Sequence, residues 1–96
     1  MTAYLLVDLV VTDPVGYEEY KAKVPALIHR HGGDYRARGG SAEAIEGDWE
    51  PNRFVIIEFP SVASAHAFLD DPDYALIRGI RHRCARSRLI VVEGIS

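Results

Sequence analysis

The residues best suited to chemistry gather at positions 31–40, which read His-Gly-Gly-Asp-Tyr-Arg-Ala-Arg-Gly-Gly. A histidine titrates near neutral pH, and an arginine offers a fork of donors that matches a carboxylate. Glycine pairs at both ends of the stretch suit a helix stop and an interruption of an extended chain. The spacing predicts a basic strand that opens directly after a helix ending at His31, and we expect a functional site there.

His31 closes an apolar helical stripe that also contains Tyr17 and Tyr20. One interpretation makes it a general base that faces a cavity between helices and sheet, with Tyr17, Tyr20 or Tyr35 nearby. Such a site suits proton abstraction from an activated phenol or enol. The alternative is a histidine hydrogen-bonded to the end of its own helix, where the helix dipole favours its protonated form.

Two carboxylates fall within strands that are otherwise apolar, Asp8 and Glu58. A carboxylate inside a strand is costly to bury unless it is paired or protonated. Arg38 is the expected partner of Glu58, and Arg81, which helical spacing turns toward the same interior, is the other candidate. These groups form either structural ion pairs or an anion-binding pocket with Arg38 and Arg81 as clamps and Glu58 as a base.

No residue pattern indicates a metal or a cofactor. The four histidines do not share a helix face at ligand spacing, Cys84 is the single cysteine, and phosphate-binding glycine loops are absent. Trp49 lies in a segment of turn composition. We interpret it as an aromatic lid on the sheet edge or on a partner subunit, or as a platform for a ligand.

The elements that must position these residues follow from periodicity and capping. Apolar runs predict strands, Asp13-Pro14 and Pro60-Ser61 begin helices, and Asp71-Pro72 breaks and restarts the second one. The expected strands cover 3–11, 53–59 and 87–93, with extended chain over 34–46 interrupted at Gly39-Gly40, and the expected helices cover 14–31, 62–70 and 73–85.

This β-α-β-β-α-β order is that of a single ferredoxin-like α+β domain over residues 1–96, a four-stranded antiparallel sheet with its helices on one side. Strands 3–11 and 53–59 are apolar on both faces, whereas the helices cover one face only. Large exposed apolar patches are rare on monomers, so we expect a homodimer that packs sheet against sheet.

Composition excludes several classes of partner. Apolar residues make up 48% and charged residues 26%, with a net charge of −3, which gives no clustered positive field for nucleic acid. No apolar run is long enough for a membrane span, and Met1 leads straight into a strand pattern. We therefore expect a cytoplasmic protein that binds neither nucleic acid nor membrane.

Several blocks together resemble the family called domain of unknown function 1330, and they span nearly the whole chain in order. They are Gly32-Gly33-Asp34-Tyr35, Arg38-Gly39-Gly40, Glu46-Gly47-Asp48-Trp49-Glu50-Pro51, Arg53-Phe54-Val55-Ile56-Ile57-Glu58-Phe59-Pro60-Ser61, Asp71-Pro72-Asp73-Tyr74 and Val92-Glu93-Gly94. The resemblance implies a dimeric α+β barrel. Proteins with that wider fold include cofactor-independent monooxygenases, muconolactone isomerases and haem-degrading proteins. The chain departs from the family pattern at Leu69, where an aromatic residue is expected, and at Asp71, where serine is usual.

Two hypotheses remain. The first is a cofactor-independent oxygenase or isomerase with its site between helices and sheet; the second is a non-catalytic dimeric module that binds a small organic or anionic ligand or simply assembles. The predicted catalytic residues are His31 and Glu58. The predicted ligand-binding residues are Tyr20, Tyr35, Arg38, Trp49, Tyr74 and Arg81.

Overall fold

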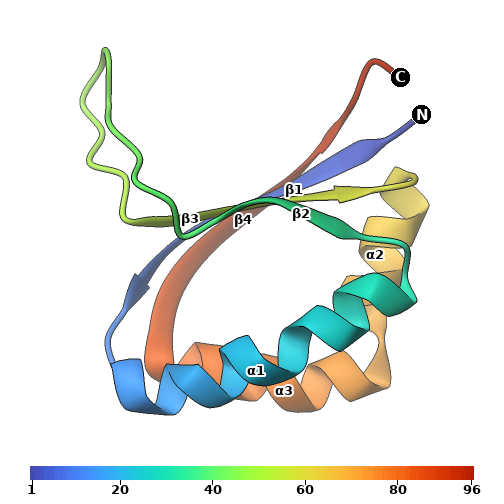
Figure 1. Ribbon diagram of the computed structural model, residues 1–96, viewed down its shortest axis with the longest axis horizontal. Helices are drawn as coiled ribbons and strands as arrows, with labels where there is room; N and C mark the ends of the chain where they lie inside the picture. The colour runs from blue at the N-terminus through green and yellow to red at the C-terminus, as the bar shows by residue number, and fades with distance from the viewer.

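The computed structural model describes residues 1–96 as a four-stranded sheet with three helices packed on one of its faces (Figure 1). The elements follow the order β-α-β-β-α-α-β. Their bounds are β1 Ala3–Val11, α1 Pro14–Arg30, β2 Asp34–Arg38, β3 Arg53–Phe59, α2 Val62–Asp70, α3 Pro72–Cys84 and β4 Ala85–Glu93. The predicted ferredoxin-like plan is confirmed, with the second helix divided into α2 and α3 as the Asp71-Pro72 pair indicated.

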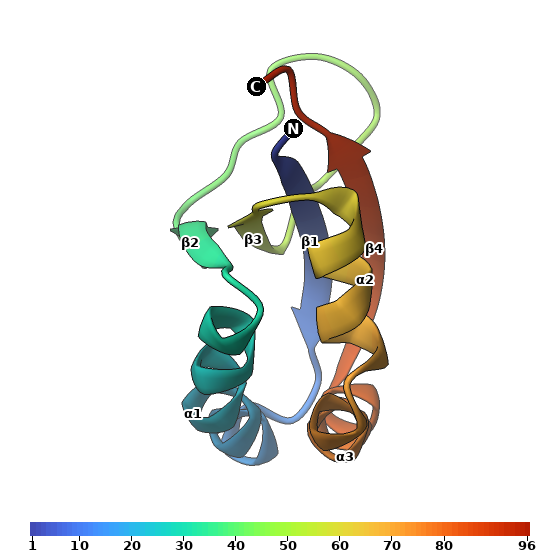
Figure 2. The same cartoon turned by 90° about the vertical axis from the view of Figure 1, so that its right-hand side faces the viewer.

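The sheet is antiparallel, in the strand order β2-β3-β1-β4. α1 and α3 lie side by side at the bottom of Figure 2, and α2 lies above α3, in front of β1 and β4. The two central strands, β1 and β3, are the two that the sequence marks as apolar on both faces. The helices cover only one face of these two strands, so within a single chain the apolar residues of their other face have no layer against them.

Side-chain caps define where each helix begins. Asp13 accepts a hydrogen bond from the Gly16 amide at 3.1 Å, Ser61 from the Ser64 amide at 3.0 Å, and Asp71 from the Asp73 amide at 2.9 Å. Each satisfies an amide that has no partner within its helix. α1 ends before Gly32, whose φ of +79° lies in the left-handed region that other residues enter at a steric cost.

The core lies between the helices and one face of the sheet. Alternate residues of β1 and β3 face it, and aromatic rings from three elements meet there: Phe59 and Phe68 have centroids 5.6 Å apart, and Phe68 and Tyr74 4.3 Å. The five largest fully buried side chains are Tyr74, Phe59, Phe68, Leu5 and Ile28. This layer fixes α3 against the sheet and so places the side chains that α3 turns inward.

The opposite face of the sheet carries no helix. Ile90 is 61% exposed there and Val92 44%, and Leu6 and Ile56 of the central strands lie on the same face. We call this surface the open face. The apolar face that the sequence predicted is therefore present and uncovered in a single chain.

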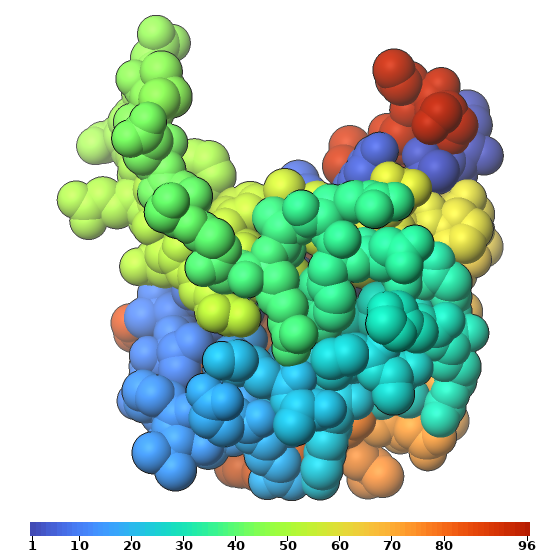
Figure 3. Space-filling model, viewed as in Figure 1, coloured from blue at the N-terminus to red at the C-terminus, as the bar shows by residue number.

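Extended chain was expected over 34–46, but β2 ends at Arg38 and the rest of that segment has no regular structure. The break falls at Gly39, whose φ is +72°. The irregularity within β2 lies between Tyr35 and Ala37 rather than at the glycine pair. Residues 39–52, which we call the arm, project away from α1 and α3 on the side of the open face (Figures 1 and 3).

Candidate functional site

A cavity of about 30 Å³ lies between the helices and the core-facing side of the sheet. Its walls are apolar side chains of β1, β3 and α1, interrupted by polar groups from both layers. Those polar groups are Tyr17, Tyr20, Lys21, Tyr35, Arg38, Tyr74 and Arg81. A space of this size holds about one or two water molecules. The structure therefore shows a small pocket whose walls are mainly apolar and include several polar side chains.

Arg81 is the buried cation of this cavity. Its side chain comes from the last turns of α3, and the residue is only 5% exposed. It donates from Nη1 to the Ser87 hydroxyl, and its Nη2 lies 3.4 Å from Nε2 of His82. Its Nε has no hydrogen-bond partner, and no carboxylate forms an ion pair with it. A charge that is buried without a counter-ion is costly.

Arg38 lies at the mouth of the same cavity. Its Nη2 donates to the carbonyl oxygen of Lys21 on α1 at 2.8 Å, and its guanidinium lies 4.7 Å from the centroid of the Tyr35 ring. Arg38 likewise forms no ion pair. This side chain bridges β2 and α1 beside the cavity, and we call the bridge the Arg38 latch.

Phenol groups make up most of the remaining polar lining. The hydroxyls of Tyr20 and Tyr74 lie 2.8 Å apart, so one of them donates to the other. Burial raises the pKa of Tyr17, Tyr20 and Tyr35 above the usual value near 10. These phenols are therefore neutral at physiological pH, and they can donate hydrogen bonds but add no negative charge.

The chemistry of the lining follows from these charges. Arg38, Arg81 and Lys21 contribute positive charge, and no aspartate or glutamate lines the cavity. Lys21 pairs with Glu18 on the outer surface of α1 at 3.2 Å. Arg38 and Arg81 have no counter-ion. A guanidinium in a water-poor pocket attracts an anion more strongly than the same group in solvent.

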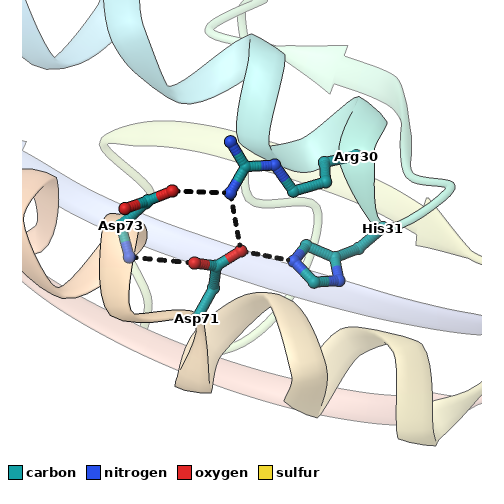
Figure 4. A network of polar contacts seen from close by, with 4 residues as sticks. All are labelled: Arg30, His31, Asp71 and Asp73. Atoms are coloured by element: carbon teal, nitrogen blue, oxygen red, sulfur yellow. Dashed lines mark hydrogen bonds and ion pairs between the residues drawn. The ribbon is translucent and has the colours of Figure 1, made fainter.

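His31 does not line this cavity, contrary to the sequence-based interpretation. It follows the last turn of α1 and points to the junction of α2 and α3, where its Nε2 lies 2.8 Å from Oδ2 of Asp71 (Figure 4). Arg30 donates to Asp71 at 3.1 Å and to Asp73 at 2.8 Å. His31 thus belongs to a network that joins the end of α1 to the start of α3.

Asp71 is the centre of that network. The hydrogen bond from His31, followed by those from the Asp73 amide and Arg30, lowers the pKa of Asp71 to about 2. Sequence reasoning identified Asp71 only as a helix break and as a departure from a family serine. The Asp-Pro pair signalled a cap, but the contact with His31 depends on a helix packing that no local pattern encodes.

Glu58 also lies outside the cavity, and its predicted pairing with Arg38 is wrong. The bulge in β2 is the physical reason. Strict alternation places Arg36 and Arg38 on one face, but the extra residue brings Arg38 opposite the core-facing Val55 and leaves Arg36 beside Glu58. The observed pair is Arg36 Nε to Glu58 Oε1 at 3.2 Å, on the open face.

Trp49 belongs to the arm and lies over the open face, away from the cavity. Its Nε1 donates to Asp8 at 3.2 Å, and its ring meets Phe54 edge-on at 6.0 Å. Asp8 also accepts from Arg88 at 3.0 Å and from the Asn52 amide at 3.3 Å. Burial alone would raise the pKa of Asp8, but these hydrogen bonds outweigh it and hold the pKa below its usual range.

Of the eight side chains predicted for the site, the structure gathers five at one cavity: Tyr20, Tyr35, Arg38, Tyr74 and Arg81. The other three, His31, Glu58 and Trp49, lie elsewhere. No group of three or more histidine, cysteine, aspartate or glutamate side chains is placed to hold a metal ion. None of the helices combines the length and apolar character needed to cross a membrane.

Comparison with known proteins agrees with this architecture. The sequence matches the profile of the family described as Domain of unknown function (DUF1330) over residues 2–95. The chain belongs to this family. None of the curated proteins compared with it matches its sequence.

Solved structures with a similar fold include proteins of unknown function, a cofactor-independent oxygenase and a putative antibiotic biosynthesis monooxygenase. A protein of unknown function from Rhodopseudomonas palustris is 23% identical, with a TM-score of 0.78 over 99% of this chain and 83% of its own. SnoaB from Streptomyces nogalater, a cofactor-independent oxygenase, is 12% identical, with a TM-score of 0.66 over 99% and 94%. A dimeric ferredoxin-like protein of unknown function from a Jannaschia species is 14% identical, with a TM-score of 0.65 over 98% and 100%. At these identities the likeness shows the fold alone.

Proposed function

We propose that this member of the DUF1330 family binds a small organic anion, such as a carboxylate, in the cavity between its helices and sheet. The observation that carries the proposal is Arg81, a buried cation whose Nε has no partner and which has no carboxylate within ion-pair distance. The anionic group of the ligand supplies the missing counter-ion. Apolar walls from Leu5, Val7 and Ile57 take the rest of the molecule.

Entry of the ligand requires the cavity to open. Its volume of about 30 Å³ is too small for an organic molecule, so one wall must move as the ligand arrives. The Arg38 latch is the polar bridge at the mouth, and it exchanges one acceptor, the Lys21 carbonyl, for another, the ligand's anionic group. A charge-assisted bond to a carboxylate is stronger than one to a neutral carbonyl, which favours this exchange.

The protein functions as a homodimer that packs its open faces together. Support comes from the exposed Ile90 and Val92 on that face and from the dimeric ferredoxin-like proteins among the similar structures. Apolar area buried between two copies contributes about 25 cal/mol per Å² before the cost of association.

Catalysis is the second candidate, and one observation favours it. The Tyr20–Tyr74 hydroxyl pair, at 2.8 Å inside the cavity, gives a bound ligand a neutral proton donor beside a cation, as a reaction through an enolate or phenolate needs. No carboxylate or histidine lines the cavity, and burial raises the pKa of Tyr17, Tyr20 and Tyr35, so these groups supply no ionised base at neutral pH. A catalytic version therefore requires a substrate that brings its own base or an already ionised group.

The test compares matched pairs of probes, benzoate with benzamide and hexanoate with hexanamide, by NMR titration and calorimetry. Each acid differs from its amide mainly in charge. We expect each carboxylate to bind at least tenfold more tightly than its amide, about 1.4 kcal/mol. Arg81→Gln removes this preference, while Arg83→Gln, which alters an exposed arginine of the same helix, leaves it unchanged.

Two results would overturn the proposal. The first is equal binding of acids and amides by the native protein. The second is an unchanged carboxylate preference in Arg81→Gln. Consumption of any bound carboxylate, followed by the appearance of a new species in the NMR spectrum, would favour the catalytic candidate over simple binding.

A further inference from the structure

We infer that the arm, residues 39–52, is a dimer clasp: it extends beyond the open face of its own chain and grips the second copy. The inference goes beyond ligand binding and rests on the proposed homodimer. It assigns a role to a segment that the ligand cavity does not use. The occupant to which it commits is a second copy of this chain.

The shape of the arm is the first observation. Residues 39–52 have no regular structure and form a projection at one end of the sheet, whereas the two termini rise at the other end (Figure 3). The surface between them is concave in that view. Connections of this length without secondary structure are uncommon in small domains and usually have a function.

The apolar content of the arm is the second observation. Ile45 is 85% exposed and Trp49 49%, which is unfavourable for a segment that meets only water. Two adjoining hollows, of about 410 and 420 Å³, lie where the arm meets the sheet, and both are lined by Trp49 and Phe54. One of them also reaches Leu6 and Ile90 of the open face. The arm and the open face therefore form one continuous apolar surface.

Charge complementarity indicates which occupant fits. The arm carries four acidic residues, Glu43, Glu46, Asp48 and Glu50, and no lysine or arginine. The start of β4 presents Arg86 and Arg88 on the open face, since they pair across the sheet with Val10 and Asp8. Arg86 forms no ion pair within its own chain. In a twofold dimer Arg86 of each copy is the basic group left for the acidic arm of the other, since Arg88 already pairs with Asp8 of its own chain.

The base of the arm is held in place before any partner arrives. Asp8 accepts hydrogen bonds from Trp49 and from the Asn52 amide, and the Gly39 amide donates to the Phe54 carbonyl at 2.9 Å. A pre-ordered segment loses less conformational entropy on association than a free one. The arm is thus oriented for docking at little entropic cost.

The first test measures the dimer dissociation constant by sedimentation velocity for three variants of the full chain. Ile45→Asp places a charge on the exposed apolar residue of the arm, and we expect it to weaken the dimer at least tenfold. Leu76→Asp is the matched control, because Leu76 is 78% exposed on α3 and lies outside the interface. Ile90→Asp disrupts the open face and tests the homodimer itself.

The second test follows cleavage by a protease specific for glutamate. The native arm offers two sites, Glu43 and Glu46, because Glu50 precedes Pro51, and it is clasped only in the dimer. We expect cleavage there to accelerate at least tenfold when the protein is diluted below its dissociation constant, and to be fast at every concentration in Ile45→Asp.

The outcomes separate the two proposals. A native protein that stays monomeric at every concentration overturns both the homodimer and the clasp. A native dimer that Ile90→Asp disrupts and Ile45→Asp leaves intact overturns the clasp and keeps the homodimer. Arm cleavage at the same rate in dimer and monomer also overturns the clasp.

Discussion

At the scale of single residues, the proposed binding function depends most on the guanidinium of Arg81. The residue is buried and lines the cavity, it donates to the Ser87 hydroxyl, and its Nε has no hydrogen-bond partner. A structural role and a binding role predict different consequences of its removal. Breaking a buried ion pair costs about 3–5 kcal/mol, whereas removing a buried charge that has no counter-ion costs little or even stabilises.

We therefore predict that Arg81→Met changes the free energy of unfolding by no more than about 1 kcal/mol, because the lost hydrogen bond offsets the relief of desolvation. The measurement is urea denaturation of the unliganded protein. A loss of about 3 kcal/mol or more would show that Arg81 holds the fold together, as in the structural ion-pair alternative.

In this scheme Arg38 slows the departure of the ligand, because its guanidinium bonds the ligand's anionic group beside the opening. Arg38→Met keeps an apolar stem over Tyr35 but removes the hydrogen bond to the Lys21 carbonyl. We predict that it raises the dissociation rate of a bound carboxylate at least tenfold, as seen in NMR line shapes. Arg36→Met is the control, since Arg36 lies on the open face beside Glu58. Equal dissociation rates in the native protein and Arg38→Met would exclude the latch.

At the scale of elements, the sequence predicted most of what the structure contains. Capping by Asp13 and Ser61, the helix stop at Gly32 and the restart after Asp71 all depend on local chemistry, and all were predicted correctly. The errors concern groups whose placement depends on a distant contact. The β2 bulge turned Arg38 into the cavity, and helix packing took His31 to Asp71.

At the contact between the end of α1 and the start of α3, the contribution of Asp71 to the free energy of unfolding depends on pH. The pKa of Asp71 falls from an ordinary value near 3.8 to about 2 in the folded protein. A carboxyl group with a depressed folded pKa stabilises the fold above its unfolded pKa, and this contribution is lost as the pH falls through the folded pKa. The stabilisation is therefore complete above about pH 4 and disappears toward pH 2.

We predict that Asp71→Asn is less stable than the native protein at pH 6 and that the two converge as the pH approaches 2. Urea denaturation over this pH range measures the difference. Asp73→Asn is the matched control, since Asp73 shares Arg30 but is 64% exposed and makes no contact with His31. A stability difference that is constant from pH 6 to pH 2 would mean that Asp71 acts through its shape or its cap rather than its charge.

At the scale of the whole molecule, the sheet separates two functions. Its core-facing side, with the helices, encloses the cavity, and its open face, with the arm, is the surface proposed for the second copy. β1 and β3 contribute to both, because alternate residues of each strand point to opposite sides. This arrangement accounts for central strands that are apolar throughout and yet carry Asp8 and Glu58 on the open side.

Because the cavity and the open face lie on opposite sides of the sheet, we expect ligand binding to persist without dimerisation. No cavity-lining residue lies on the open face, so a dissociated protomer retains a complete cavity. We predict that Ile90→Asp is monomeric and still binds benzoate within about threefold of the native affinity, a difference below about 1 kcal/mol. Sedimentation velocity establishes the monomer, and calorimetry on the same sample measures the affinity. A folded monomer that has lost carboxylate binding would contradict this prediction. It would mean that contact with the second copy is needed to shape the cavity on the other side of the sheet.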